Sequence, residues 1–119
     1  VFAPTADVTT GDGAAYFHTP ADLAGMDLIG ASALVITAGT TGTTDVQIAR
    51  VRSGTPADML STKITIDSTE TDSATAATAA VINGSNDDLA TSDILRIDVD
   101  ATATTKAKGL LVTLRFRLP

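Results

Sequence analysis

The chain has 119 residues, a formal net charge of −6 and 44% hydrophobic residues, of which few are aromatic. This length predicts one domain, with a core filled by Val, Ile, Leu and Ala. The acidic balance argues against nucleic-acid binding, because such binding depends on clustered Lys and Arg. The absence of cysteine excludes disulfides, thiolate zinc sites and thiol catalysis.

No segment of the sequence predicts export or membrane insertion. The first residues lack the basic and apolar regions of a signal peptide. The longest apolar stretch, residues 28–38, contains Gly30 and Ser32 and is too short to span a bilayer. We therefore expect a soluble protein without membrane contact. The chain begins at Val1 rather than Met, which would fit processing from a longer protein.

The N-terminal part of the chain predicts two short β-elements. Residues 1–10 are rich in Thr and Ala, and predict at most a short strand and an N-terminal arm. Residues 11–13, Gly-Asp-Gly, predict a turn because glycine readily adopts positive φ. Residues 14–19 predict a strand that ends before a proline.

A helical turn and the longest strand follow. Residues 20–25 predict one helical turn, with Thr19 as the N-cap and Gly25 at the C-cap. Residues 26–37 lean towards β-structure and carry apolar side chains on both alternating faces. Such a strand is expected to be covered on both sides.

The next strand is predicted to contain an irregularity. Residues 38–44 form a polar loop between two strands. Val46 and Ile48 then share a parity that Val51 breaks. A β-bulge near residues 49–50 would restore the inward face.

The segment that follows alternates short elements with polar loops. Residues 55–60 predict a helical turn, and residues 63–67 predict an alternating strand. Residues 68–76 form a polar loop, and residues 78–83 a short strand. Residues 85–93 have no β-pattern and hold three aspartates.

The C-terminal region reads as two long strands joined by a polar turn. In residues 94–101 and 110–118, apolar and polar side chains alternate, so that one face of each strand is buried. If the strands are neighbours, carboxylates of the first would meet guanidiniums of the second. These outward residues are Arg96, Asp98 and Asp100 on the first strand, and Thr113, Arg115 and Arg117 on the second.

Together these elements predict an all-β fold. About eight strands, with turn signals every eight to fifteen residues and one or two short helical turns, indicate an antiparallel β-sandwich over residues 1–119. A jelly roll is the preferred topology. An immunoglobulin-like sandwich suits the length equally well, but the chain lacks the Cys and Trp that anchor it.

No constellation of residues predicts catalysis. The one histidine, His18, lies within a predicted strand, and no nucleophile elbow, metalloprotease motif or phosphate-binding loop accompanies it. A structural or surface role is the usual one for such a residue. We therefore predict a protein that is not an enzyme and needs no cofactor.

The acidic loops raise the question of calcium. Asp67, Glu70 and Asp72 place carboxylates at positions one, four and six of a loop, and Ca²⁺ prefers such oxygen ligands. Residues 87–93 offer a second set. Neither matches the glycine-centred calcium loop, so solvated loop acids are the favoured interpretation and Asp67, Glu70 and Asp72 remain weak candidates for a metal site.

Several segments together resemble a small β-domain that recurs in virion proteins of tailed bacteriophages. The segments are residues 11–20, 23–28, 37–48, 59–68, 93–100 and 108–110, so the resemblance extends along nearly the whole length of the chain. Each alone is only a turn and a strand, but the set is distinctive. The resemblance implies a structural component of the phage particle, with no activity and no catalytic residue to transfer.

Within that setting, the first hypothesis is a capsid decoration (cement) protein on the virion surface. It would bind the major capsid protein, form a homo-oligomer, with a trimer favoured, and order residues 1–10 as an arm on the particle. Apolar residues Ile29 and Val35, together with Tyr16 and Phe17, are the candidate interface residues. Alternatively, Ile29 and Val35 pack within one subunit.

The second hypothesis is a receptor-binding or tail-fibre tip module. It would contact a host surface glycan through the loops at residues 39–44 and 67–72, because loops at the end of a sandwich commonly carry such contacts. The absence of Trp and the single Tyr argue against it, since sugar sites normally use aromatic rings.

Overall fold

The computed structural model describes residues 1–119 as ten strands and two 3-10 turns. Every strand pair is antiparallel, which confirms the predicted all-β, antiparallel fold. The elements are β1 (Phe2–Asp7), β2 (Gly11–His18), η1 (Ala21–Leu23), β3 (Asp27–Thr37), β4 (Thr44–Arg52), β5 (Thr55–Asp58), β6 (Leu60–Thr62), β7 (Ile64–Ile66), η2 (Ser73–Thr75), β8 (Val81–Ile82), β9 (Ile94–Ala101) and β10 (Lys108–Arg117).

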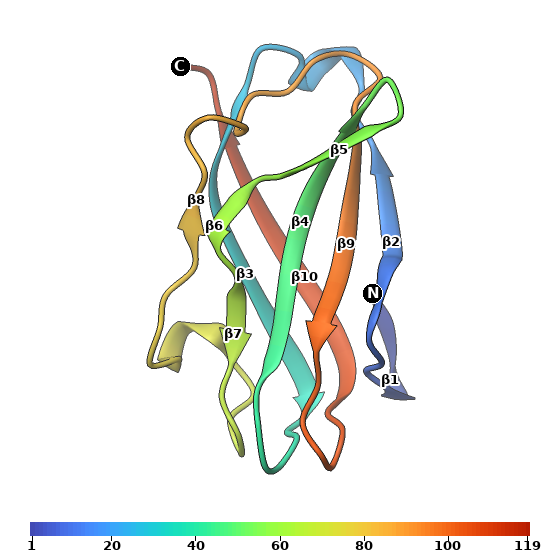
Figure 1. Ribbon diagram of the computed structural model, residues 1–119, viewed down its shortest axis with the longest axis vertical. Coiled ribbons are helices and arrows are strands. Elements are labelled where there is room, and N and C mark those ends of the chain that lie inside the picture. Colours follow the sequence, from blue (N-terminus) through green and yellow to red (C-terminus); the bar gives the residue numbers. More distant parts are fainter.

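Two sheets pack face to face (Figure 1). Sheet A has the strand order β1-β10-β3, and sheet B has the order β2-β9-β4-β5, with β7 also paired to β4. The first four strands alternate between the sheets, and the first strand lies beside the last. This is the winding of a jelly roll. A separate pair, β6 and β8, lies beside sheet A and contacts β3 through β8.

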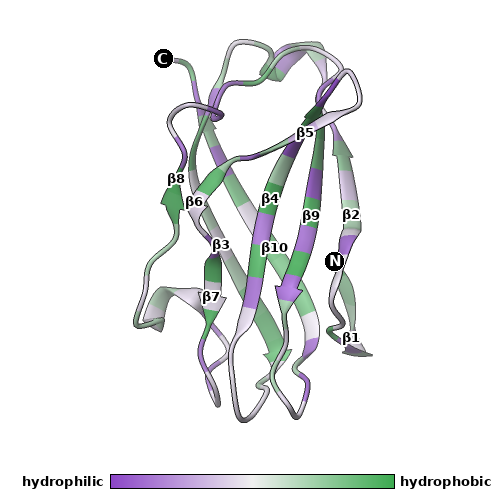
Figure 2. Cartoon of the chain, viewed as in Figure 1, coloured by the Kyte–Doolittle hydropathy of each residue, from purple (hydrophilic) through white to green (hydrophobic).

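The core lies between the two sheets and is aliphatic. Figure 2 shows apolar and polar residues alternating along β4 and β9. Alternation of this kind turns one face of each strand towards the opposite sheet. The buried cluster contains no aromatic residue, and its members are Val8, Leu28, Ala33, Val35, Val46, Ile48, Met59, Leu60, Ile64, Ile66, Leu89, Leu95, Ile97, Val99, Ala107 and Leu110. Burial of each such Val, Leu or Ile side chain contributes about 1.5–3 kcal/mol.

The two C-terminal strands are long, as predicted, but they are not neighbours. β9 lies between β2 and β4 in sheet B, whereas β10 lies between β1 and β3 in sheet A. Arg96 therefore pairs with Asp98 on its own strand, at 2.8 Å between Nε and Oδ1, and not with a residue of β10. The alternation of each strand was read correctly, but alternation does not specify in which sheet a strand lies.

The predicted bulge in β4 is wrong, and a bulge lies in β3 instead. β4 pairs with β9 in regular register from Val46 to Val51. Arg50, and not Val51, continues the inward face of Val46 and Ile48, because it reaches a carboxylate at the end of the sandwich.

In β3 the register shifts where Arg115 lies opposite Gly30 and Phe116 opposite Leu28, so that Ile29 is an extra residue. This bulge moves Val35 to the inward face. Val35 is 1% exposed and belongs to the core, so its prediction as an outward interface residue was wrong.

Two local predictions failed because tertiary pairing overrode them. Residues 11–13 open strand β2 rather than form a turn, and residues 55–58 form β5 rather than a helical turn. Ser53 and Gly54 both have positive φ and join Arg52 to its partner Thr55, which is the two-residue turn of a β-hairpin. Pro56 is tolerated because β5 lies at the edge of sheet B.

The two N-terminal elements have clear places in the sandwich. The 3-10 turn at Ala21–Leu23 agrees with the predicted helical turn, although Pro20 and not Thr19 occupies the N-cap. Residues 1–10, predicted as an arm, lie against the sandwich in this structure. β1 pairs with β10, and Val8 is fully buried in the core, which ties the segment to the domain.

Candidate functional site

The candidate site is a cleft at the edge of the sandwich where β2 faces β10. Its volume is about 320 Å³. Strands β2 and β9 of sheet B and strand β10 of sheet A form its walls, together with Val1. The lining is entirely apolar: Val1, Ala15, Tyr16, Phe17, Ile97, Val112, Leu114 and Phe116. We refer to these eight residues as the edge cleft.

The edge cleft exists because β1 covers only part of β10. Phe2 lies opposite Leu110, and the amino nitrogen of Val1 donates a hydrogen bond of 2.7 Å to the Leu110 carbonyl oxygen. Leu110, beneath β1, is 0% exposed, whereas Val112 and Leu114 on the same face of β10 are only partly buried. The inward face of β10 is therefore open to solvent beyond the end of β1.

All four aromatic residues of the chain lie on the strands at this edge, namely Phe2 on β1, Tyr16 and Phe17 on β2, and Phe116 on β10. Phe17 lies opposite the buried Leu95, so it faces the interior, yet it is 44% exposed. Tyr16 lies opposite Arg96 on the outer face, is 67% exposed and folds its ring over Gly13. Exposed aromatic side chains on a rigid sheet are typical of protein-binding sites.

A second apolar surface lies on the outer face of sheet A. It consists of Leu34 and Ile36 on β3 and Leu111 on β10, and we call it the outer patch. Leu34 lies directly opposite Leu111. The exposed fraction is 37% for Leu34, 50% for Ile36 and 49% for Leu111. Gly109 is required beside it, because a Cβ there would meet Ile36 Cγ1 at 2.8 Å and Pro4 Cα at 3.0 Å.

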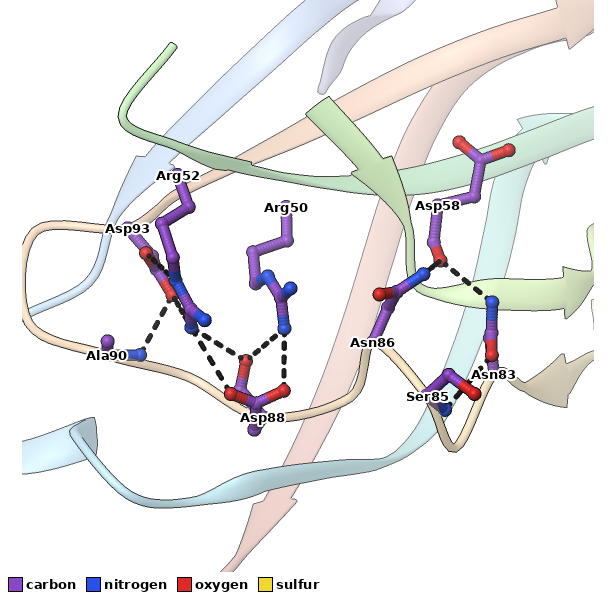
Figure 3. Close-up of polar contacts among 9 residues, drawn as sticks. All are labelled: Arg50, Arg52, Asp58, Asn83, Ser85, Asn86, Asp88, Ala90 and Asp93. Carbon is purple, nitrogen blue, oxygen red and sulfur yellow. Dashed lines mark hydrogen bonds and ion pairs between the residues drawn. The ribbon is translucent and has the colours of Figure 1, made fainter. Parts of the chain in front are cut away.

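The charged side chains cluster instead at the end of the sandwich that holds β5 and residues 85–93 (Figure 3). Arg52 binds Asp93 through two hydrogen bonds of 2.9 and 2.7 Å, and Arg50 binds Asp88 at 2.7 Å. Arg50 also donates to the Asp88 carbonyl oxygen at 2.9 Å. These four residues, the arginine clamp, hold residues 85–93 against β4.

The pKa values of the arginine clamp follow from this geometry. The hydrogen bond and charge of Arg52 lower the pKa of the Asp93 carboxyl, although burial opposes them. Burial acts to raise the pKa of Asp88, but the hydrogen bond and charge of Arg50 outweigh it and the net shift is downward. Both carboxylates are thus ionised at neutral pH and paired within the chain, which assigns the cluster a role in stability.

The weak calcium candidates each support a local turn. Asp67 Oδ2 accepts from the Ala77 N–H at 2.8 Å, and Asp72 Oδ1 accepts from the Ala74 N–H at 2.9 Å. Glu70 Oε2 accepts from Thr75 Oγ1 at 2.9 Å. Nowhere in the chain do three or more His, Cys, Asp or Glu side chains gather in a group that could hold a metal ion.

The structure brings together only two of the predicted interface residues. Tyr16 and Phe17 both line the edge cleft, whereas Ile29 is 38% exposed at the bulge of β3 and Val35 is buried. His18 is exposed at the end of β2. Sequence reasoning missed the outer patch, although the alternation of β10 already placed Leu111 on the outward face.

The comparisons with known proteins give no further guide. No protein-family model, no curated protein and no solved structure matches this chain. No helix in the structure has the length and apolar character needed to cross a bilayer.

Proposed function

We propose that this chain is a non-enzymatic structural protein of a bacteriophage particle, most simply a capsid decoration protein that binds the major capsid protein on the head surface. The outer patch is the observation that carries the proposal. Leu34 and Leu111 form an exposed cross-strand apolar pair on the outer face of sheet A, and exposed apolar groups on such a surface favour protein contact. The resemblance of the sequence to phage virion domains supplies the setting.

The edge cleft supports the same class of function, because it gives the domain a second apolar surface. The outer patch lies on the face of sheet A, and the edge cleft opens between β2 and β10. Two separate surfaces would allow the protein to contact the capsid and also a further chain. A homo-oligomer, with a trimer favoured, belongs to this proposal, and its mass would be close to three times 12.1 kDa.

Particle reconstitution tests the proposal. The purified chain is added to heads that lack it, and the heads are imaged by electron microscopy. We expect ordered density at symmetry-related positions over the head, and at least a tenfold loss of occupancy for the Leu34→Ser, Leu111→Ser double variant, which corresponds to about 1.4 kcal/mol. Val81→Ser is the matched control, because Val81 is equally exposed but lies on β8. Absence of density on heads would overturn the proposal.

A receptor-binding module is the second candidate, and one observation favours it. The two loops expected to contact a glycan lie together, since the Thr69 N–H donates to the Gly39 carbonyl oxygen at 2.8 Å and the Thr41 N–H donates to Ser68 Oγ at 2.9 Å. No aromatic residue lies in either loop, however. Binding of the labelled chain to intact host cells, together with no binding to heads, would support this function instead.

A further inference from the structure

We propose that the edge cleft binds an extended strand of a partner protein, which pairs with β10 and carries apolar residues alternating with acidic ones. This inference deepens the proposed function, because it specifies the kind of segment that a neighbouring protein of the particle would supply. It rests on the proposed function only for the identity of that neighbour. The strand itself is inferred from three features of the cleft.

The first feature is a free backbone edge. β10 pairs with β3 from Lys108 to Arg117, but β1 reaches only the Lys108–Leu110 part of its other edge. The N–H and C=O groups that residues 112–117 direct to this side have no strand partner. An unpaired edge of this kind is a template for strand addition. Six residues extend over about 20 Å, which is enough for a short strand.

The second feature is the apolar floor beneath that edge. Residues directly opposite each other in a sheet point to the same side. Every second side chain of an added strand would therefore enter the edge cleft beside Val112, Leu114 and Phe116, with Phe17 on the opposite wall. The strand would lie beside residues 112–117 and would lower the exposure of these side chains towards that of Leu110, which pairs with β1 and is 0% exposed.

The third feature is the charge on the outer face. The remaining side chains of the added strand would lie beside Thr113, Arg115 and Arg117. Neither of these arginines belongs to any of the seven ion pairs of the chain. Asp27 is the cross-strand neighbour of Arg117, yet no ion pair forms between them within 4.0 Å. The Arg115 guanidinium lies over Gly30 of β3, so a carboxylate on the incoming strand would meet Arg117 directly and Arg115 after a rotamer change of this exposed side chain.

The same charges argue against a second copy of this chain as the occupant. Pairing of β10 with β10 of another copy would bring Arg115 and Arg117 of both copies onto one face, and like charges across a strand pair are destabilising. Attraction of an acidic strand would have to come from Arg115 and Arg117 themselves and not from the net charge of the chain. The whole chain carries a net charge of −6, which by itself would repel an acidic peptide.

Peptide binding tests the inference without a phage particle. The probe is a capped heptapeptide that alternates Val and Glu, and the comparison peptide has Lys in place of each Glu. At low salt we expect the acidic peptide to bind at least tenfold more tightly than the basic one. Amide chemical-shift changes measured by NMR should be confined to β10, β2 and the N-terminal end of β1.

A charge-reversal variant sharpens the test. Arg115→Glu, Arg117→Glu changes only exposed side chains, so we expect it to fold and to prefer the basic peptide. Lys106→Glu is the matched control, because this exposed residue lies in the loop before β10, and it should leave the preference unchanged. A preference that is reversed equally by both variants would reflect net charge and would overturn the inference.

The remaining outcomes also decide the matter. No saturable binding would overturn the inference, and so would shifts centred on β5 and β7, the other edge of sheet B. Self-association of the native chain with amide shifts centred on β10 would identify a second copy as the occupant and overturn the partner strand. Peptide binding by a chain that fails to decorate heads would overturn the proposed function alone.

Discussion

The two long sides of sheet A differ, because loop residues cover the β3 edge whereas β1 covers β10 only in part. At the β3 edge, irregular residues lie where a further strand would run, and they supply its backbone partners. The Val35 N–H donates to the Thr71 carbonyl oxygen at 2.8 Å, and the Leu28 N–H donates to the Asp87 carbonyl oxygen at 2.9 Å. At the β10 edge, β1 pairs with residues 108–110 only, and no strand of the structure pairs with residues 112–117 on that side.

This difference shows what an edge needs in order to be closed. Backbone donors can be satisfied by scattered contacts from a loop, as the Ala33 N–H is by Ser73 Oγ at 3.0 Å. The segment that supplies the Asp87 carbonyl oxygen, residues 85–93, is held in place by the arginine clamp (Figure 3). The β10 edge has apolar side chains but no covering segment, and it is therefore the edge that is available for a partner.

The largest expected effect comes from comparing two positions on one face of β10. Leu110→Ala removes a fully buried side chain in the part of β10 that pairs with β1, and we expect the free energy of unfolding to fall by about 3 kcal/mol. Leu114→Ala removes the same atoms from the open cleft and should cost about 1 kcal/mol. Urea denaturation of both variants measures the difference. Equal losses would show that the cleft is closed in solution.

The next effect concerns the arginine clamp, which holds residues 85–93 against β4. Arg52→Met leaves the Asp93 carboxylate, whose side chain is 2% exposed, without its ion pair. We expect a loss of about 2–3 kcal/mol, because a buried charge that loses its partner is costly. Arg117→Met is the control, since Arg117 forms no ion pair and should change stability by less than about 0.5 kcal/mol. A loss of similar size in both variants would contradict this role of the clamp.

A smaller effect should appear in the pH dependence of stability. Because Arg52 lowers the pKa of Asp93 in the folded state, the pair stabilises the protein above the unfolded-state value of about 3.9. This stabilisation is lost as the pH falls through the lower folded-state pKa. The difference in unfolding free energy between the native chain and Arg52→Met should therefore narrow between pH 6 and pH 2.5, approximately, when measured by denaturant titration. A constant difference would contradict the ion-pair explanation.

The sequence predicted which side chains of β10 face the edge cleft, but not that the cleft is open. Alternation placed Leu114 and Phe116 inward and Arg115 and Arg117 outward, and the structure agrees for these residues. The sequence predicts Tyr16 and Phe17 as interface residues, and both line the edge cleft. Nothing in the pattern showed that β1 would pair with only residues 108–110 of β10, so the openness of the cleft could not be derived.

Other predictions failed for a similar reason. A single bulge at Ile29 reversed the facing of the rest of β3, so Val35 became buried and Leu34 and Ile36 became exposed. The predicted alternation of side chains in β3 is correct, but which of the two alternating sets faces the core depends on the pairing of β3 with β10. The position of Arg50 also depends on a distant residue. Arg50 continues the apolar face of β4 because its guanidinium pairs with the Asp88 carboxylate at the end of the sandwich.

The sequence by itself determined the class of fold, the positions of the long strands and the aliphatic nature of the core. These depend on the alternation of side chains and on turn residues, which act over a few neighbouring positions. Only the tertiary structure decided that β9 and β10 lie in opposite sheets, which edge a loop covers and which edge stays open. Such features depend on pairings between residues far apart in the chain, and a local pattern fits several of these pairings equally well.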